Sequence, residues 1–161
     1  MRKNIKLRVK NLVNKYQTAD PFALAKELDV NILYVPLPEK IRGILVRVLR
    51  KKTILLNDKL NYEAQKIVIF HELGHVRMHW HAGYFFQHEG IYYSPARYEC
   101  EANEFAIHLL NYSSDFIYDK DYILEVLAKE NPNPYEVHKI INALMQIESI
   151  LFIRCLLNRF S

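Results

Sequence analysis

A His-Glu-x-x-His sequence constrains this chain more than any other feature. Residues 71–75 read His-Glu-Leu-Gly-His. On an α-helix, His71 and His75 lie one turn apart on the same face, where two imidazoles can bind a single zinc ion. Glu72 follows the first histidine, in a position from which a carboxylate can take a proton from metal-bound water. The sequence therefore predicts a helix with a catalytic zinc site, which needs a third protein ligand and an open fourth position.

The surroundings of the motif favour a site over two histidines on a surface helix. Apolar residues flank the pair, and Gly74 lies between the histidines, where a helical glycine costs about 1 kcal/mol relative to alanine. A costly glycine at this place predicts that something approaches the helix closely, such as another backbone or a second helix. The flanking apolar residues are Val68, Ile69, Phe70 and Leu73.

Three downstream residues are candidates for the third ligand. His79 continues the i+4 series, but eight residues place it roughly 12 Å along the helix axis from His71, too far to share one ion. His81 has the spacing of the longer His-Glu-x-x-His-x-x-Gly-x-x-His pattern. Met78, however, stands where that pattern needs glycine to turn the last histidine inward. Glu99 is the better candidate.

Glu99 lies near the start of a second predicted helix. Ser94-Pro95 reads as an N-cap followed by proline at the first helical position, and residues 96–106 are compatible with a helix. Glu99 and Asn103 are one turn apart, so Glu99 could complete a His-His-Glu site while Asn103 accepts a hydrogen bond from a metal-bound histidine. Glu101 is the rival carboxylate, but its side chain points about 160° away from that face.

These segments resemble the ImmA/IrrE family of metallopeptidases. The resemblance extends over roughly residues 20–145, and the order and spacing of its three segments make it specific. The matching segments are Thr53–Asn57, a strand that ends in asparagine; Ile69–His79, the zinc helix with a trailing histidine; and Glu99–Leu110, the helix with the third ligand.

The resemblance implies a small zinc protease that cuts or inactivates a helix-turn-helix repressor, often in a mobile element or a stress response. By the same resemblance, Zn²⁺ would be bound by His71, His75 and Glu99, with Glu72 as the general base. The chain departs from the family pattern at Asn111-Tyr112, where methionine and proline are common. That departure leaves open any substrate contact at the end of the second helix.

The rest of the chain predicts one α+β domain over residues 1–161, with a small, mostly antiparallel sheet packed against a helical, zincin-like core. At 161 residues, half of them hydrophobic, the chain can bury one substantial core. Residues 1–17 predict a basic amphipathic helix, and residues 146–161 an apolar C-terminal helix. Further helices are expected over 20–28, 62–79, 119–129 and 135–158, and strands over 30–35, 44–49 and 53–56, the last two as a hairpin.

Charge, cysteine content and hydropathy narrow the classes of function. The net charge is +4, and the basic face of the first helix is more simply a solvated surface, so no direct nucleic-acid contact is expected. Two cysteines without a signal peptide predict a cytoplasmic protein, in which Cys100 is buried as a small apolar residue. No apolar run approaches the ~20 residues that span a bilayer, so no membrane association is expected.

The sequence therefore predicts a cytoplasmic zinc metalloprotease, and the family resemblance implies that its substrate is a regulatory protein, most simply a DNA-binding repressor. The alternative is a non-proteolytic, zinc-containing regulatory module that acts on a repressor by contact. A pure binding module would have no need of Glu72. A structural zinc domain would require a closed site with four protein ligands, and no further cysteine or histidine has a convincing spacing from the motif. The donor that stabilises the oxyanion stays open among His79, His88, Tyr92 and Tyr93.

Overall fold

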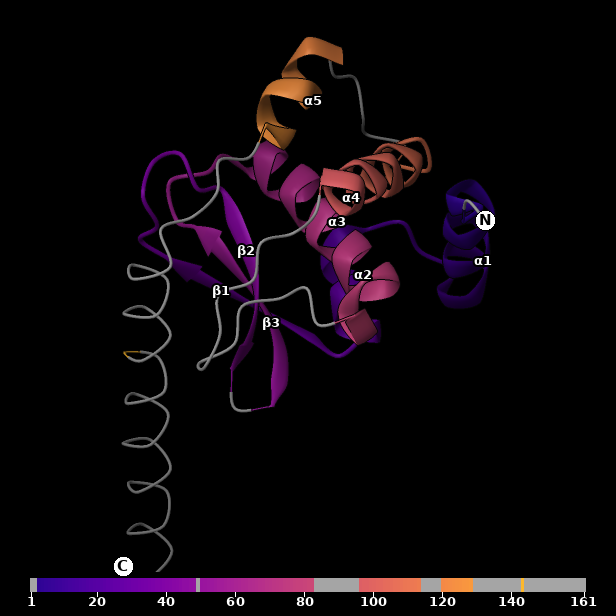
Figure 1. Ribbon diagram of the computed structural model, residues 1–161, viewed down its shortest axis with the longest axis horizontal. Helices are drawn as coiled ribbons and strands as arrows, with labels where there is room; N and C mark the ends of the chain where they lie inside the picture. The colour runs from indigo at the N-terminus through magenta and orange to yellow at the C-terminus, as the bar shows by residue number, and fades with distance from the viewer. Residues whose placement is uncertain (1–2, 49, 83–95, 114–119, 129–142, 144–161) are drawn as a thin grey trace, which may run out of the picture.

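The computed structural model describes residues 3–48, 50–82, 96–113, 120–128 and 143. Within these residues, the helices are gathered to one side of a small sheet (Figure 1), and the predicted α+β class is confirmed. The helices are α1 (Ile5–Tyr16), α2 (Pro21–Glu27), α3 (Tyr62–Met78), α4 (Ala96–Leu110) and α5 (Lys120–Leu127), with a short 3₁₀ helix, η1 (Trp80–Ala82). The strands are β1 (Val30–Val35), β2 (Gly43–Val48) and β3 (Lys51–Asn57).

The sheet has the strand order β1-β3-β2. β2 and β3 form the predicted antiparallel hairpin, and Arg50 at its tip has a φ of 66°, a left-handed conformation suited to a tight turn. β1 pairs with β3 in parallel, with Tyr34 opposite Leu56. The sheet is thus mixed, and the expected antiparallel arrangement holds only for the hairpin. β3 is the central strand, and in the described residues β2 pairs along one side only.

α3 is the central helix and carries the His-Glu-x-x-His motif. Asn61 caps its start, because its side-chain oxygen accepts a hydrogen bond of 2.8 Å from the backbone N–H of Ala64. The helix contacts β2 and β3 on one side and α4 on another (Figure 1). Residues 66–76 are consequently all buried, as expected for a helix covered on every side. This burial keeps bulk water away from the motif.

α1 is the predicted basic amphipathic helix. Its buried side is formed by Ile5, Val9 and Leu12, and the helix packs against α4. The opposite side is exposed, so the predicted amphipathic character is confirmed, whereas the absence of a nucleic-acid contact stays a prediction. The exposed basic residues of this helix are Lys6, Arg8, Lys10 and Lys15.

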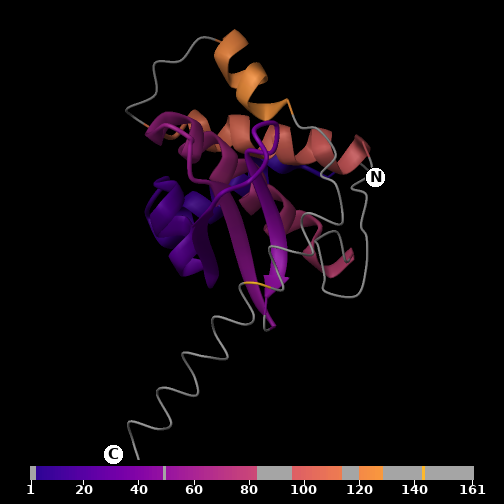
Figure 2. The same ribbon diagram turned by 90° about the vertical axis from the view of Figure 1, so that its left-hand side faces the viewer.

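α5, the orange helix in Figure 1 and Figure 2, packs against α3. Val126 and Leu127 at its C-terminal end are each only 7% exposed. Directly after the helix, the carbonyl oxygen of Ala128 accepts a hydrogen bond of 2.6 Å from Nη1 of Arg42. This bond joins the end of α5 to the residue that precedes β2.

Asn57, at the end of β3, organises the connection between β1 and β2. The side chain is buried at 3% exposure, and its Oδ1 accepts a hydrogen bond of 3.1 Å from the backbone N–H of Lys59. Its amide nitrogen donates to backbone carbonyls of the connecting segment, so the asparagine satisfies polar groups that would otherwise be buried without partners. The three acceptors are Leu37 at 3.2 Å, Pro38 at 3.3 Å and Ile41 at 3.0 Å.

Several predicted features lie outside the described residues. These are the Ser94-Pro95 cap, the candidate oxyanion donors His88, Tyr92 and Tyr93, and nearly all of the helices expected over 135–158 and 146–161. The single domain over residues 1–161 stays a prediction. No helix in the described part of the chain is both long and apolar enough to cross a membrane.

Candidate metal centre

The two histidines of the motif face one another on α3 as the helical spacing requires. His71 and His75 are each 3% exposed, and their Nε2 atoms are 3.2 Å apart. The rings meet edge to face, at an interplanar angle of 79°. Both Nε2 atoms therefore point to the same small region between α3 and α4.

Glu99 of α4 brings its carboxylate to this region. Its Oε2 lies 3.1 Å from Nε2 of His71, and its Oε1 lies 3.2 Å from Nε2 of His75. Zinc bonds of about 2.0–2.1 Å in a tetrahedral site place neighbouring ligand atoms about 3.3 Å apart. The observed separations match that geometry, so these three side chains fit a zinc ion.

Glu72 is the second carboxylate near the two histidines. It is 1% exposed, and one of its oxygens lies within 4.8 Å of the ligand atoms of His71 and His75. Glu99 faces both Nε2 atoms, at 3.1 and 3.2 Å, so the geometry suits Glu99 as a ligand, and it leaves Glu72 as a base acting through water.

A small cavity of about 10 Å³ adjoins Glu72 and His71. Its other walls come from the start of β2, from α3 and from the end of α5. This volume is roughly what a single water molecule needs. The cavity therefore offers space for a small polar molecule beside the Glu72 carboxyl group. The remaining lining residues are Arg42, Gly43, Val68, Val126 and Leu127.

Asn103 orients the first histidine, one turn after Glu99 on α4. Its Oδ1 is 2.7 Å from Nδ1 of His71. An amide oxygen only accepts hydrogen bonds, so Nδ1 carries the proton and Nε2 presents its lone pair to the site. The predicted contact between Asn103 and a histidine of the motif is confirmed.

His79 and Glu101 form a buried pair behind the second histidine. Nδ1 of His79, which is 0% exposed, lies 3.0 Å from Nδ1 of His75, and its Nε2 lies 2.8 Å from Oε2 of Glu101. His79 thus contacts the ring edge of His75 that faces away from Glu99. It is placed neither as a ligand nor as an oxyanion donor.

The electrostatics of this pair follow from its burial. Desolvation lowers the pKa of His79, and the hydrogen bond with Glu101 opposes only part of that effect. For Glu101, burial raises the pKa, but hydrogen bonds from His79 and Arg97 outweigh it, so the pKa lies below its ordinary value. Both directions favour a neutral imidazole beside an ionised carboxylate.

Gly74 explains why α4 comes close enough for Glu99 to reach the histidines. A Cβ atom at this position would lie 3.1 Å from Cα of Ala102 and 3.2 Å from Cβ of Phe105. The two helices therefore cross with almost no side chain between them. The close approach predicted from the glycine is confirmed, and the approaching element is α4.

Comparison with known proteins places this arrangement in a family. The model of the peptidase M78 family, described as the IrrE N-terminal-like domain, matches residues 25–139. The chain belongs to this family. The match includes the sheet, α3 and α4, and thus every residue of the centre described above. Membership implies a metallopeptidase-type hydrolase.

A curated relative of this M78 chain comes from a bacteriophage. The chain is 38% identical over 106 residues to "Uncharacterized immunity region protein 2" of Bacillus phage phi105, which covers 66% of this chain and 67% of the relative. No solved structure matches the chain.

Other polar residues of this M78 chain lie away from the centre. His81 is exposed on η1, and His108 faces Glu104 at 3.7 Å on α4, as an ordinary helix residue would. The expectation of a buried Cys100 is wrong, because the thiol is exposed. α4 packs through the face that contains Ala102, and a residue two positions earlier points to nearly the opposite side.

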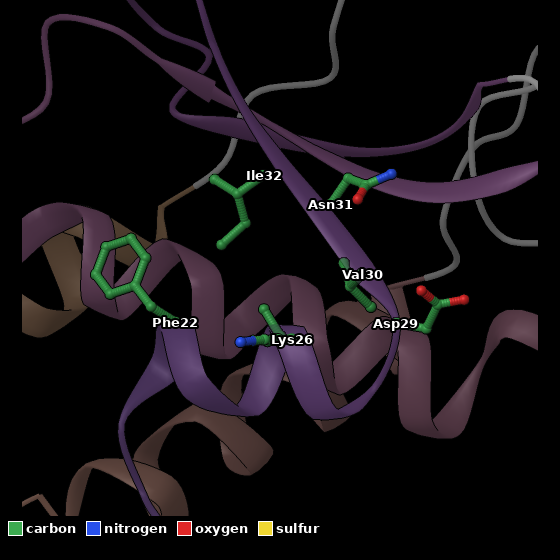
Figure 3. A pocket seen from close by; sticks show the side chains of 7 residues that line it. Phe22, Lys26, Asp29, Val30, Asn31 and Ile32 are labelled. Carbon is green, nitrogen blue, oxygen red and sulfur yellow. The ribbon is translucent and has the colours of Figure 1, made fainter.

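A separate hollow of about 290 Å³ lies between α2 and β1 (Figure 3). Lys26, Asp29 and Asn31 are its polar lining residues. The candidate metal centre, with His71, His75 and Glu99, lies elsewhere, where α3 contacts α4.

Proposed function

We propose that this chain is a zinc-dependent endopeptidase that cuts a regulatory protein in the cytoplasm, with a helix-turn-helix transcriptional repressor as the substrate. The observation that carries the proposal is the convergence of His71, His75 and Glu99 to within 3.1–3.2 Å, with the carboxyl group of Glu72 beside them. Membership of the M78 family supports proteolysis, and the phage immunity-region relative supports a repressor as the target.

The chain's own residues account for the steps of peptide hydrolysis. Zinc, held by His71, His75 and Glu99, would supply a Lewis acid that lowers the pKa of water toward about 7 and polarises the scissile carbonyl. Glu72 takes the proton of the attacking water on its carboxylate and returns it to the leaving amine. Val126, next to the cavity, helps exclude bulk water from this exchange.

A non-proteolytic module that acts by contact is less consistent with the burial of Glu72. A carboxylate at 1% exposure is costly to desolvate, and simple binding to a repressor would not require it. Proton transfer beside a metal does require it, which favours the enzyme.

Cleavage of a helix-turn-helix repressor from a neighbouring reading frame would test the proposal. We expect the purified, zinc-loaded protein to cut that repressor into discrete fragments, which intact-mass spectrometry would detect. Cleavage should stop when a chelator removes the metal and resume when zinc is restored, since the ion is part of the reaction. A repressor that stays intact with the zinc-loaded chain, in solution and on co-expression, would contradict the proposal.

We further propose that the substrate binds as an extended strand along β2. β2 is an edge strand within the described residues, and Gly43 at its start lines the cavity beside Glu72. The backbone N–H of Asn57 donates to the carbonyl of Arg42 at 2.9 Å, which identifies a hydrogen-bonded pair of the hairpin. Because such pairs alternate along an antiparallel ladder, the N–H of Leu45 points away from β3, toward an incoming strand.

Replacing Leu45 with proline is therefore expected to slow repressor cleavage by about tenfold while the hairpin persists, because proline removes an outward N–H and no ladder bond. The rate constant for cleavage is the measurement. Leu45→Ala is the matched control, since it shortens the same side chain but keeps the N–H. If the proline variant folds, binds zinc and cleaves as fast as Leu45→Ala, the substrate does not add to β2.

A further inference from the structure

We propose that His79 and Glu101 are positioning residues that hold the ring of His75 in the orientation and tautomer that bind the metal. The inference rests on the proposed function, because it takes His75 as a ligand. It gives a role to two residues that provide no atom to the ion and lie on the far side of the His75 ring.

The hydrogen-bond geometry allows one arrangement of protons when His75 binds metal. Nε2 of His75 must keep its lone pair for the ion, so Nδ1 carries the proton and donates it to Nδ1 of His79 at 3.0 Å. His79 then carries its proton on Nε2, which donates to Oε2 of Glu101 at 2.8 Å. In this series of hydrogen bonds, each donor meets an acceptor, and the last acceptor is the carboxylate of Glu101.

The surroundings of Glu101 keep it ionised although it is only 8% exposed. Nε of Arg97 donates to its Oε1 at 3.1 Å, and Nζ of Lys3 lies 4.0 Å from its Oε2. The ring of Tyr98 packs over the ring of His79, with ring centroids 4.1 Å apart. His79 is thus enclosed, and the negative charge of Glu101 is balanced by the two nearby basic side chains.

Stability alone does not explain this arrangement. Buried ionic and polar pairs are often matched or exceeded in stability by apolar side chains of similar volume, because desolvation offsets their attraction. A histidine and a glutamate enclosed between two helices therefore suggest a requirement beyond packing. His79 contacts Nδ1 of His75 directly, and Glu101 acts on the same atom through its hydrogen bond with His79.

His71, the other histidine of the motif, also has a hydrogen-bond partner at its Nδ1, which supports a positioning role for His79 at His75. His71 is oriented by Asn103, and His75 by His79 with Glu101 behind it. Asn103 and Glu101 both lie on α4, the helix that also carries Glu99. α4 thus supplies one ligand, the residue that orients His71, and the carboxylate that holds His79 against His75.

Metal affinity tests the role directly. We expect His79→Phe, which keeps a ring but removes both hydrogen bonds, to weaken zinc binding by about 10–100-fold, the usual cost of losing such a partner. His79→Asn places an oxygen near the position of Nδ1, where it can still accept from His75, and should recover a large part of that loss. Competition against a chelator of known zinc affinity measures both. His108→Phe is the matched control and should bind zinc as the unmodified chain does.

Two further measurements separate positioning from folding. Thermal unfolding of the metal-free variants should show that His79→Phe still folds, and the visible absorption bands of bound Co²⁺ should change in that variant but not in His108→Phe. Glu101→Gln keeps an acceptor without the charge, and we expect it to weaken zinc binding by several-fold, whereas Glu104→Gln should not. If His79→Phe does not fold, the zinc affinity of Glu101→Gln tests the positioning role in its place.

The outcomes are distinguishable from failure of the proposed function. If the unmodified chain binds no zinc, the function is wrong and the positioning role falls with it. If that chain binds zinc but His79→Phe, or Glu101→Gln in its place, binds within about twofold of it, the positioning role alone is wrong. A His79→Asn variant as weak as His79→Phe would also overturn it.

Discussion

Replacing Glu72 with glutamine is expected to reduce repressor cleavage by a factor on the order of 10² or more, while zinc binding stays close to that of the unmodified chain. Glutamine keeps the size of the side chain and most of its hydrogen bonding but has no basic carboxylate. The fold should persist, because the substitution removes a charge from a site that is only 1% exposed. Cleavage rate, zinc content and thermal unfolding are the three measurements.

Glu63→Gln is the matched control for this variant. It makes the same change on the same helix, at a partly exposed position in the first turn, and should cleave normally. A Glu72→Gln variant that relieves repression in cells as well as the unmodified chain would favour the module that acts by contact. Loss of zinc together with activity would instead show that Glu72 helps to hold the metal.

Replacing Glu99 with alanine is expected to weaken zinc binding by roughly 10²-fold or more. Complete zinc sites are worth about 10–16 kcal/mol in small domains, so one ligand of four contributes roughly 3 kcal/mol. Glu99 is the ligand candidate on α4, and alanine leaves the two histidines of α3 without a third partner. Chelator competition and metal content after dialysis would measure the loss.

Two comparisons make the Glu99 result specific. His81→Ala should retain zinc fully, because the histidine is exposed on η1. Glu101→Ala should lose affinity to an intermediate degree, of about 10–100-fold, since it acts through His79 rather than on the ion. Equal zinc content in Glu99→Ala and the unmodified chain would contradict the assignment, whatever the behaviour of the other two.

Local periodicity determined much of the site from the sequence alone. The i,i+4 spacing places His71 and His75 on one face of a helix, and the same rule places Glu99 and Asn103 on one face of another. Gly74 between the histidines indicated a close neighbour, and the β2–β3 hairpin followed from two β-prone segments with a basic turn between them. Each of these inferences needs only residues that are near one another along the chain.

The tertiary structure decided what depends on how separate elements pack. The crossing at Gly74 and Ala102 sets the rotation of α4 about its axis, and that rotation turns Glu99 toward the histidines, Glu101 toward His79 and Cys100 toward solvent. The parallel pairing of β1 with β3, which leaves β2 as an edge beside the cavity, is likewise a long-range contact. Sequence periodicity assigns residues to the faces of one helix or strand, but the partner of each face is determined by packing across the whole core.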